Sequence, residues 1–343
     1  MIPVPKVSVV IPTRNRPLTL RNAVKSVLAQ TLSDLEVIVV IDGEDGVETS
    51  SLIASFRDER LRCISVPNAV GGSEARNIGV RHARSGFVAL LDDDDEWLPT
   101  KLEKQLKKAE EHPAGTAVVV TTQHIHRASG VPDVVRPRRL PRPNEEITEF
   151  MFDYLCYFQT STFFCSKELI ARLPFASGLP SLQDVDWFLR VMREAGTQLV
   201  VVPEALTIYH SPEGRKTITS ATKWRSLIEW GRANWHLMTR RAYSRFVVGS
   251  CAARAAKEHA GIKGLATLLY ECTINGLPTP KLICLLCGSY LLKPQIRTKL
   301  RDRYMLRKLA GPTVSTVATA SADLMSPVQD VASGTRSNLR RIG

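Results

Sequence analysis

The chain has 343 residues, of which 44% are hydrophobic and 23% are charged, and its formal net charge is +12. This composition is ordinary for a globular protein and leaves room for one large domain with an appendage or for two domains. No run approaches roughly 18 uninterrupted apolar residues, so we expect no transmembrane helix. Residues 1–6 also lack the pattern of a signal peptide.

The first third of the chain alternates apolar strands with helical segments. We expect strands at 7–11, 35–41, 61–66, 87–91 and 116–121, and helices at 17–30, 47–56, 73–84 and 101–111. Further along, 160–164 and 207–209 are strand-like and 185–194 has the pattern of an amphipathic helix. This rhythm predicts a mostly parallel sheet with helices on both faces.

Beyond about Ser211 only helical patterns remain, over 224–259 and 261–290. Trp224, Trp230 and Trp235 recur there at helical spacing, so we expect them to be packing residues. The last segment, 312–343, is rich in Ser, Thr and Ala without periodicity, which is typical of a flexible tail. We therefore predict a first domain over 1–214 with halves 1–120 and 121–214, a helical region over 215–311, and the tail.

The seven cysteines are scattered and odd in number. Cys284 and Cys287 form a lone CxxC pair on an apolar helical segment, with no second pair nearby. This favours buried free thiols over a zinc site or a disulfide, and it fits a reducing, cytoplasmic compartment.

Four consecutive aspartates, Asp92 to Asp95, follow the predicted strand 87–91. Adjacent carboxylates repel one another unless a cation or solvent relieves the repulsion. Oxygen ligands suit a hard divalent cation such as Mg²⁺ or Mn²⁺, which usually also contacts substrate phosphates. The alternative is a solvated acidic loop before the next helix, but parallel sheets bind ligands at this end of their strands, and this favours the metal.

Three other polar segments lie at the same predicted edge of the sheet. Pro12 to Arg16 ends the first strand, Asp42-Gly43 ends the second, and Gly71 to Gly79 opens the helix after the third. Asp42 can accept a hydrogen bond from the imide N–H of a base, and Arg76 can pair with phosphate. Together these segments predict a pocket for a nucleoside diphosphate.

In five segments the chain resembles the family 2 glycosyltransferases, which have the GT-A fold. The matching segments are 7–16, 36–43, 75–79, 91–97 and 183–190, in this order, and the resemblance covers about 7–210. It implies a GT-A type, Rossmann-like sheet flanked by helices, with a C-terminal helical appendage. It also implies an inverting transfer of sugar from a nucleotide-diphosphate sugar, with UDP as the expected nucleotide, to a hydroxyl of a glycan or lipid-linked glycan.

The resemblance assigns roles to single residues. Pro12, Thr13, Arg14 and Asp42 match the base and ribose pocket, and Arg76, Asp92 and Asp93 match other donor contacts. Asp92 and Asp94 match the metal-binding acids, with Asp95 as a supporting acid. Asp184 matches the general base, preceded here by Gln183 where many members have an acid. His210 matches a histidine near the diphosphate or metal, with a structural role as the alternative.

Two other functions remain open. A sugar nucleotidyltransferase would have a glycine-rich phosphate loop after the first strand, and the segment 12–16 lacks the glycines. A catalytically silent nucleotide-sugar-binding module would have lost Asp184 or the aspartates, and both are present.

The positive charge is concentrated in an arginine- and proline-rich loop, 136–142, and in the segment 297–308. Such patches attract nucleic acid, anionic lipid or phosphorylated substrates. No nucleic-acid-binding motif occurs, so we expect no nucleic-acid partner. The apolar run 282–292 before the basic segment resembles a peripheral contact with the inner face of the cell membrane, and a packed helix with a solvated basic edge is an equal alternative.

His124 and His126 are also spaced to lie on one face of a strand. With no third ligand in the pattern, we do not favour a metal site there.

Overall fold

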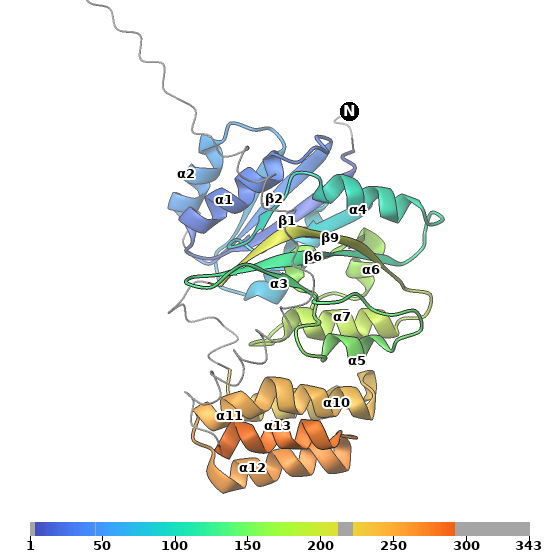
Figure 1. The fold of residues 1–343 in the computed structure, drawn as a ribbon. Helices are drawn as coiled ribbons and strands as arrows, with labels where there is room; N and C mark the ends of the chain where they lie inside the picture. The colour runs from blue at the N-terminus through green and yellow to red at the C-terminus, as the bar shows by residue number, and fades with distance from the viewer. Residues whose placement is uncertain (1–3, 45, 212–221, 292–343) are drawn as a thin grey trace, which may run out of the picture. The chain divides into compact units, whose positions relative to one another are not determined.

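The structure is a computed structural model, and it describes residues 4–44, 46–211 and 222–291 (Figure 1). Residues 1–290 form one compact unit. The predicted tail at 312–343, the basic segment 297–308 and the predicted boundary between 214 and 215 lie outside the described residues.

A nine-stranded sheet forms the centre of this unit, in the order β3-β2-β1-β4-β8-β6-β9-β5, with β7 paired to β6. The strands are β1 (Val7–Thr13), β2 (Leu35–Asp42), β3 (Leu61–Val66), β4 (Phe87–Leu90), β5 (Glu96–Trp97), β6 (Val118–Ala128), β7 (Val134–Arg136), β8 (Phe164–Ser166) and β9 (Gln198–Ser211). The first four strands pair in parallel, whereas β8 runs antiparallel to both β4 and β6. The predicted helix-flanked α/β sheet is confirmed.

The strands are apolar on both faces because helices cover both faces. Alternate residues of β1 enter different cores, Val9 on one side and Val10 on the other. Helices α1 (Pro17–Leu28) and α4 (Lys101–Glu110) pack on the Val9 side, and α3 (Gly72–His82), α6 (Lys167–Arg172) and α7 (Gln183–Arg193) on the Val10 side (Figure 1). Helix α2 (Gly46–Ser55) and helix α5 (Ile147–Met151) complete this part.

The predicted boundaries are wrong in the second half of the sheet. The segment expected as a strand at 160–164 is a 3-10 turn, Thr160–Thr162, followed by β8. The side chain of Gln159 accepts a hydrogen bond from the N–H of Ser161 and so caps this turn. The strand expected at 116–121 runs on to Ala128 as β6, and the segment expected at 207–209 belongs to the longer β9. These strands pair across long sequence separations, which local pattern does not report.

The C-terminal region is helical, as predicted. It contains α9 (Trp224–Ala233), α10 (Arg240–Phe246), α11 (Ala253–Lys257), α12 (Gly261–Tyr270) and α13 (Pro280–Leu291), with π-helical turns after α10 and after α12. Trp224 and Trp230 are buried in the same core as α7. The packing prediction is wrong for Trp235, which is 59% exposed. All seven cysteines are free thiols, but Cys284 is exposed and not buried as expected.

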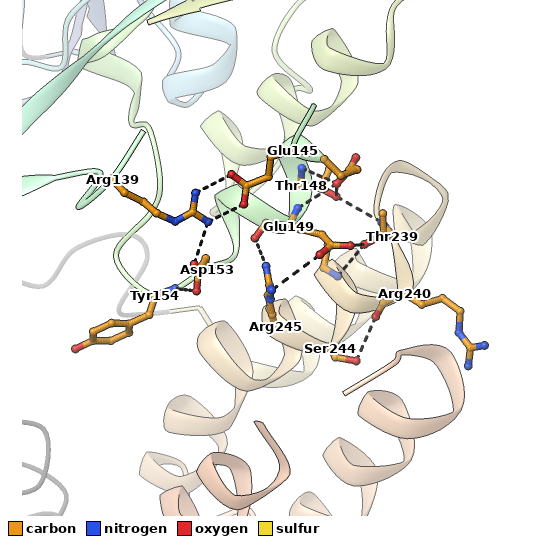
Figure 2. Close-up of polar contacts among 12 residues, drawn as sticks. Arg139, Glu145, Thr148, Glu149, Asp153, Tyr154, Thr239, Arg240, Ser244 and Arg245 are labelled. Carbon is orange, nitrogen blue, oxygen red and sulfur yellow. Dashed lines mark hydrogen bonds and ion pairs between the residues drawn. The ribbon is translucent and has the colours of Figure 1, made fainter. Parts of the chain in front are cut away.

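Polar contacts join α5 to the start of α10 (Figure 2). The carboxylate of Glu149 accepts a hydrogen bond from Thr239 Oγ1 at 3.0 Å, and Arg245 donates to the backbone carbonyl of the same glutamate. Close by, Arg139 of the basic loop pairs with Glu145 and Asp153, so its charge is neutralised within the fold (Figure 2).

Glu36 joins three strands at the end of the sheet where β2 begins. Its carboxylate, only 1% exposed, accepts hydrogen bonds from Ser8 Oγ at 2.6 Å and from the backbone N–H of Arg84 at 2.7 Å, and it pairs with Arg62 of β3. Burial would raise the pKa of Glu36, but these bonds and charges outweigh burial and hold the pKa below its ordinary value of 4.5.

We expect Glu36→Gln to lower the free energy of unfolding by about 2 kcal/mol at pH 7, because the amide keeps only one of the two acceptor oxygens and loses the charge that pairs with Arg62. The pKa of Glu36 is lower in the folded state than in the unfolded state. The carboxylate therefore stabilises the fold fully when the pH is above the unfolded-state pKa, and this stabilisation is lost as the pH falls through the folded-state pKa. Chemical denaturation of both proteins between pH 7 and pH 3 should therefore show a difference that shrinks in acid. The same change at the exposed Glu59 is the control, and a difference independent of pH would contradict the prediction.

Candidate functional site

The four aspartates follow β4 directly and alternate in exposure. Asp93 and Asp95 are buried, at 4% and 1% exposed, whereas the side chains of Asp92 and Asp94 are 27% and 21% exposed. Oxygens of Asp92, Asp94 and Asp95 all lie within 4.8 Å of one another. The two partly exposed carboxylates are the ones predicted to hold a metal.

The two buried aspartates anchor the run. Asp93 accepts hydrogen bonds from Thr13 Oγ1 at 2.7 Å and from Arg16 Nη1 at 3.0 Å, and burial together with the charge of Asp94 raises its pKa to about 6. Asp95 accepts from Ser161 Oγ at 2.6 Å and from the N–H of His210 at 3.3 Å. Burial also raises the pKa of Asp95 well above its ordinary value. Both oxygens of Asp95 therefore have donors within the fold, and its predicted supporting role beside a metal stays a prediction.

Arg76 connects the aspartates to the start of α7. Its guanidinium donates from Nη2 to Asp92 at 2.5 Å and from Nη1 to Gln183 Oε1 at 2.9 Å. Only 8% of Arg76 is exposed, and its guanidinium lies over the ring of Phe175. Burial between a carboxylate and an amide fixes this cation at the mouth of the site.

Asp184 lies in the first turn of α7, partly exposed and next to Gln183. Burial raises its pKa, the negative charge of Asp92 adds to this, and Arg76 opposes it. Asp184 therefore lies within electrostatic range of Asp92 and Arg76. A carboxylate whose pKa is raised in this way accepts a proton more readily than an ordinary aspartate.

A cavity of ≈ 540 Å³ lies at the ends of β1, β2 and β3, and it is lined by Arg14, Asn15, Gly43, Glu44, Pro67, Asn68 and Ala69. Pro12 is half-buried on β1 beside it. Asp42 is 4% exposed, and its two oxygens accept hydrogen bonds from the N–H groups of Val70 and Gly71 at 2.6 and 3.0 Å. In this structure Asp42 therefore shapes the loop that enters α3, and its predicted contact with a base stays a prediction.

A second cavity, of ≈ 370 Å³, lies beside the aspartates and is lined partly by Asp94, Asp95, Glu96, Arg127 and His210. His210 Nε2 lies 3.0 Å from Glu96 Oε1, and its backbone bonds to Asp95. The histidine thus contacts the acidic run through Asp95 and through a glutamate that the sequence did not single out, and its role near a diphosphate or metal stays a prediction.

Sequence reasoning also missed Arg16 and Ser161 as parts of the site. Arg16 belongs to the family-matching segment 7–16, and a positive charge at the sheet edge that carries the aspartates could have predicted its contact with Asp93. Ser161 comes from a 3-10 turn and contacts an aspartate 66 residues away, and no local pattern announces this contact.

Comparison with known proteins finds matches to one family. A sequence model described as Glycosyl transferase family 2 matches residues 8–172. The chain is 27% identical over 211 residues to an uncharacterized glycosyltransferase of Methanocaldococcus jannaschii, covering 61% of this chain and 71% of that protein.

Two further comparisons concern donors and acceptors. The chain is 34% identical over 100 residues to an Escherichia coli UDP-Glc:alpha-D-GlcNAc-diphosphoundecaprenol beta-1,3-glucosyltransferase, over 29% of this chain and 39% of that protein. The fold matches residues 1–349 of S. aureus TarS, crystallised with UDP-GlcNAc, with a TM-score of 0.62 at 18% identity, over 87% of this chain and 89% of that one. The expected GT-A type architecture is thereby confirmed.

Together, the family model, these relatives and the shared fold support a family 2 glycosyltransferase, and the relatives' names support a transferase enzyme.

Proposed function

We propose that this enzyme transfers a sugar, with inversion, from a UDP-linked donor to a hydroxyl of a lipid-linked glycan. The observation that carries the proposal is the continuous contact Asp92–Arg76–Gln183, which brings the aspartates next to Asp184. This contact supports a site in which groups for the leaving diphosphate lie near a base for the attacking hydroxyl. The acceptor class is supported by the E. coli relative, whose name specifies a diphosphoundecaprenol-linked acceptor.

The residues at the end of β4 fit a divalent cation. Asp92 and Asp94 offer carboxylate oxygens that are close together and partly exposed, which suits Mg²⁺ or Mn²⁺. When bound, such an ion would act as a Lewis acid on the diphosphate. Arg76 would add positive charge where the diphosphate departs, in a position fixed before the reaction begins.

Asp184 is the base in this proposal. The acceptor hydroxyl gives its proton to the Asp184 carboxylate while its oxygen bonds to the anomeric carbon. The bond from that carbon to the donor phosphate breaks on the opposite face, and the electron pair leaves with the nucleoside diphosphate. A single displacement of this kind inverts the configuration at the anomeric carbon.

The nucleotide would occupy the cavity at the ends of β1 to β3, near Pro12, Thr13, Arg14 and Asp42. Incubation with a panel of nucleotide sugars and Mn²⁺, followed by measurement of nucleoside diphosphate release, tests the function. Release of pyrophosphate from a nucleoside triphosphate and sugar phosphate would instead indicate the nucleotidyltransferase. Binding without turnover would indicate the silent module.

We further propose that the enzyme works at the cytoplasmic face of a membrane. None of the helices in the described ranges has the length and apolar composition needed to cross a bilayer. The helical region nevertheless exposes large apolar side chains at Ile262, Tyr270, Ile274, Leu277 and Leu285. These residues would provide peripheral contact with the membrane that carries the acceptor.

Asp184→Asn should lower turnover by about 10²–10⁴, because the amide cannot take the hydroxyl proton. The affinity for UDP in the presence of Mn²⁺, measured by calorimetry, should stay unchanged, since the side chain keeps its size. Wild-type turnover of the variant with a verified acceptor would contradict the base assignment.

Asp94→Ala should weaken binding of UDP about tenfold or more in Mn²⁺ and little in EDTA, because only the metal-dependent part of the affinity is removed. The matched control is Asp34→Ala, at an exposed aspartate before β2. Equal affinities of the Asp94 variant and the wild type in Mn²⁺ would exclude Asp94 as a ligand.

The double change Ile262→Ser with Leu285→Ser should reduce partition onto vesicles of phosphatidylglycerol and phosphatidylcholine about tenfold, because two aliphatic side chains no longer leave water. Flotation measures the bound fraction, and Val131→Ser, an exposed valine in a loop outside the helical region, is the control. If the double variant floats as well as the wild type, these side chains are not the membrane contact.

A further inference from the structure

His124 and His126, for which the sequence offers no third metal ligand, belong to a cluster of aromatic rings around the guanidinium of Arg136. We propose that this cluster, consisting of His124, His126, Arg136, Tyr157 and Tyr209, binds a phosphate group. We assign that phosphate to the phosphate-linked end of the acceptor, and this assignment rests on the proposed function. We call these five residues the His–Arg cluster.

Three strands and one loop bring the cluster together. The antiparallel pairing of β6 with β7 places Arg136 opposite His124, and the parallel pairing of β6 with β9 places Tyr209 opposite His126. The rings of His126 and Tyr209 stack with centroids 5.3 Å apart. The ring of His124 lies 5.5 Å from that of Tyr157, which comes from the loop between α5 and the 160–162 turn.

Arg136 is a partly buried cation without a counter-ion. Its Nη1 donates to the hydroxyl of Tyr157 at 2.8 Å, and its Nε is buried without a partner. Within the described part of the chain it forms no ion pair, in contrast to the nearby Arg139, which pairs with two carboxylates. Burial of an unpaired cation is costly, so such a site is completed by an anion.

The two histidines have free hydrogen-bonding capacity at the same place. His124 is fully buried, and among the described residues neither of its ring nitrogens has a hydrogen-bond partner, nor does Nδ1 of His126. Burial and the charge of Arg136 lower the pKa of His124 to about 3 and of His126 to about 4, so both rings are neutral at pH 7. Each neutral ring keeps one N–H that can donate to a phosphate oxygen.

The same charge argues against a metal at these histidines. A divalent cation would lie beside the guanidinium of Arg136 and be repelled by it. Across the described ranges, the aspartate run is the one group of three or more metal-ligating side chains with suitable spacing. Arginine, by contrast, is the side chain best suited to phosphate, because its planar donors match two phosphate oxygens.

The cluster is connected to the reaction site through β9. Tyr209 directly precedes His210, whose N–H bonds to Asp95. Burial raises the pKa of Tyr209, and the neighbouring Tyr157 and the charges of Asp95, Asp94 and Asp92 add to this effect, so the tyrosine lies within electrostatic range of the aspartates. An acceptor held by its phosphate at Arg136 would therefore lie on the β6–β9 side of the aspartates, and the partly exposed side chains of Tyr157, Tyr209 and His126 would border its sugar.

The test measures phosphate binding without turnover. Calorimetric titrations use inorganic pyrophosphate and farnesyl diphosphate in EDTA, so that metal-dependent binding at the aspartates is absent. Arg136→Gln should weaken binding of both probes about tenfold or more. Arg138→Gln, at an exposed arginine two residues away, should change the affinity less than twofold. Wild-type affinity in the Arg136 variant, or an equal loss in the Arg138 variant, would overturn the proposal.

Three further measurements separate other outcomes. His126→Phe, at a partly exposed ring, should also weaken binding and keeps the test decisive if Arg136→Gln does not fold. Both variants should bind UDP in Mn²⁺ as the wild type does, which shows that the donor site is unchanged. The phosphate titrations need no turnover, so they stay valid even if the proposed transfer activity is not found. A third outcome is that Arg136→Gln reduces flotation with phosphatidylglycerol vesicles while the wild type does not bind farnesyl diphosphate. The phosphate would then belong to a bilayer headgroup, and the assignment to the acceptor would be overturned.

Discussion

The repulsion among four adjacent carboxylates at the end of β4 is the constraint around which this structure is arranged. Each aspartate needs a donor, a counter-charge or solvent, and the fold supplies these from distant segments. Thr13 comes from the end of β1, Arg16 from the N-cap of α1, Arg76 from α3, and Ser161 from the 160–162 turn. The backbone of His210 reaches Asp95 across 115 residues of sequence. The same contacts that relieve the repulsion therefore fix the relative positions of the elements around the site.

The position of α7 follows from these contacts. Arg76 shares its guanidinium between Asp92 and Gln183, and Gln183 is neutral where many family members carry an acid. An amide accepts the hydrogen bond without adding another negative charge beside Asp184. Farther along the helix, Asp186 accepts a hydrogen bond from the indole of Trp230 at 3.2 Å, and Arg193 donates to the carbonyl of Leu237. The helical region thus holds the helix that carries Asp184 as well as contributing to the core.

The positive charge of the chain is used in different ways at different places. Arg139 is neutralised inside the fold, Arg16 and Arg76 balance the aspartates, and Arg136 has no acid beside it among the described residues. Electrostatic attraction to phosphate therefore does not follow from the net charge of +12. The attraction depends on which guanidinium groups have no carboxylate partner in the folded protein.

The sequence by itself determined the α/β fold, the strand-end position of the aspartates and the helical nature of the C-terminal region. These features depend on local periodicity and on the rule that parallel strands end at one edge of a sheet. Only the tertiary structure decided which carboxylates are buried, that Asp42 bonds to loop amides, that Trp235 is exposed, and that Arg136 lies opposite His124. Each of these is a contact or an exposure set by packing between segments far apart in the chain, and a local pattern carries no information about such packing.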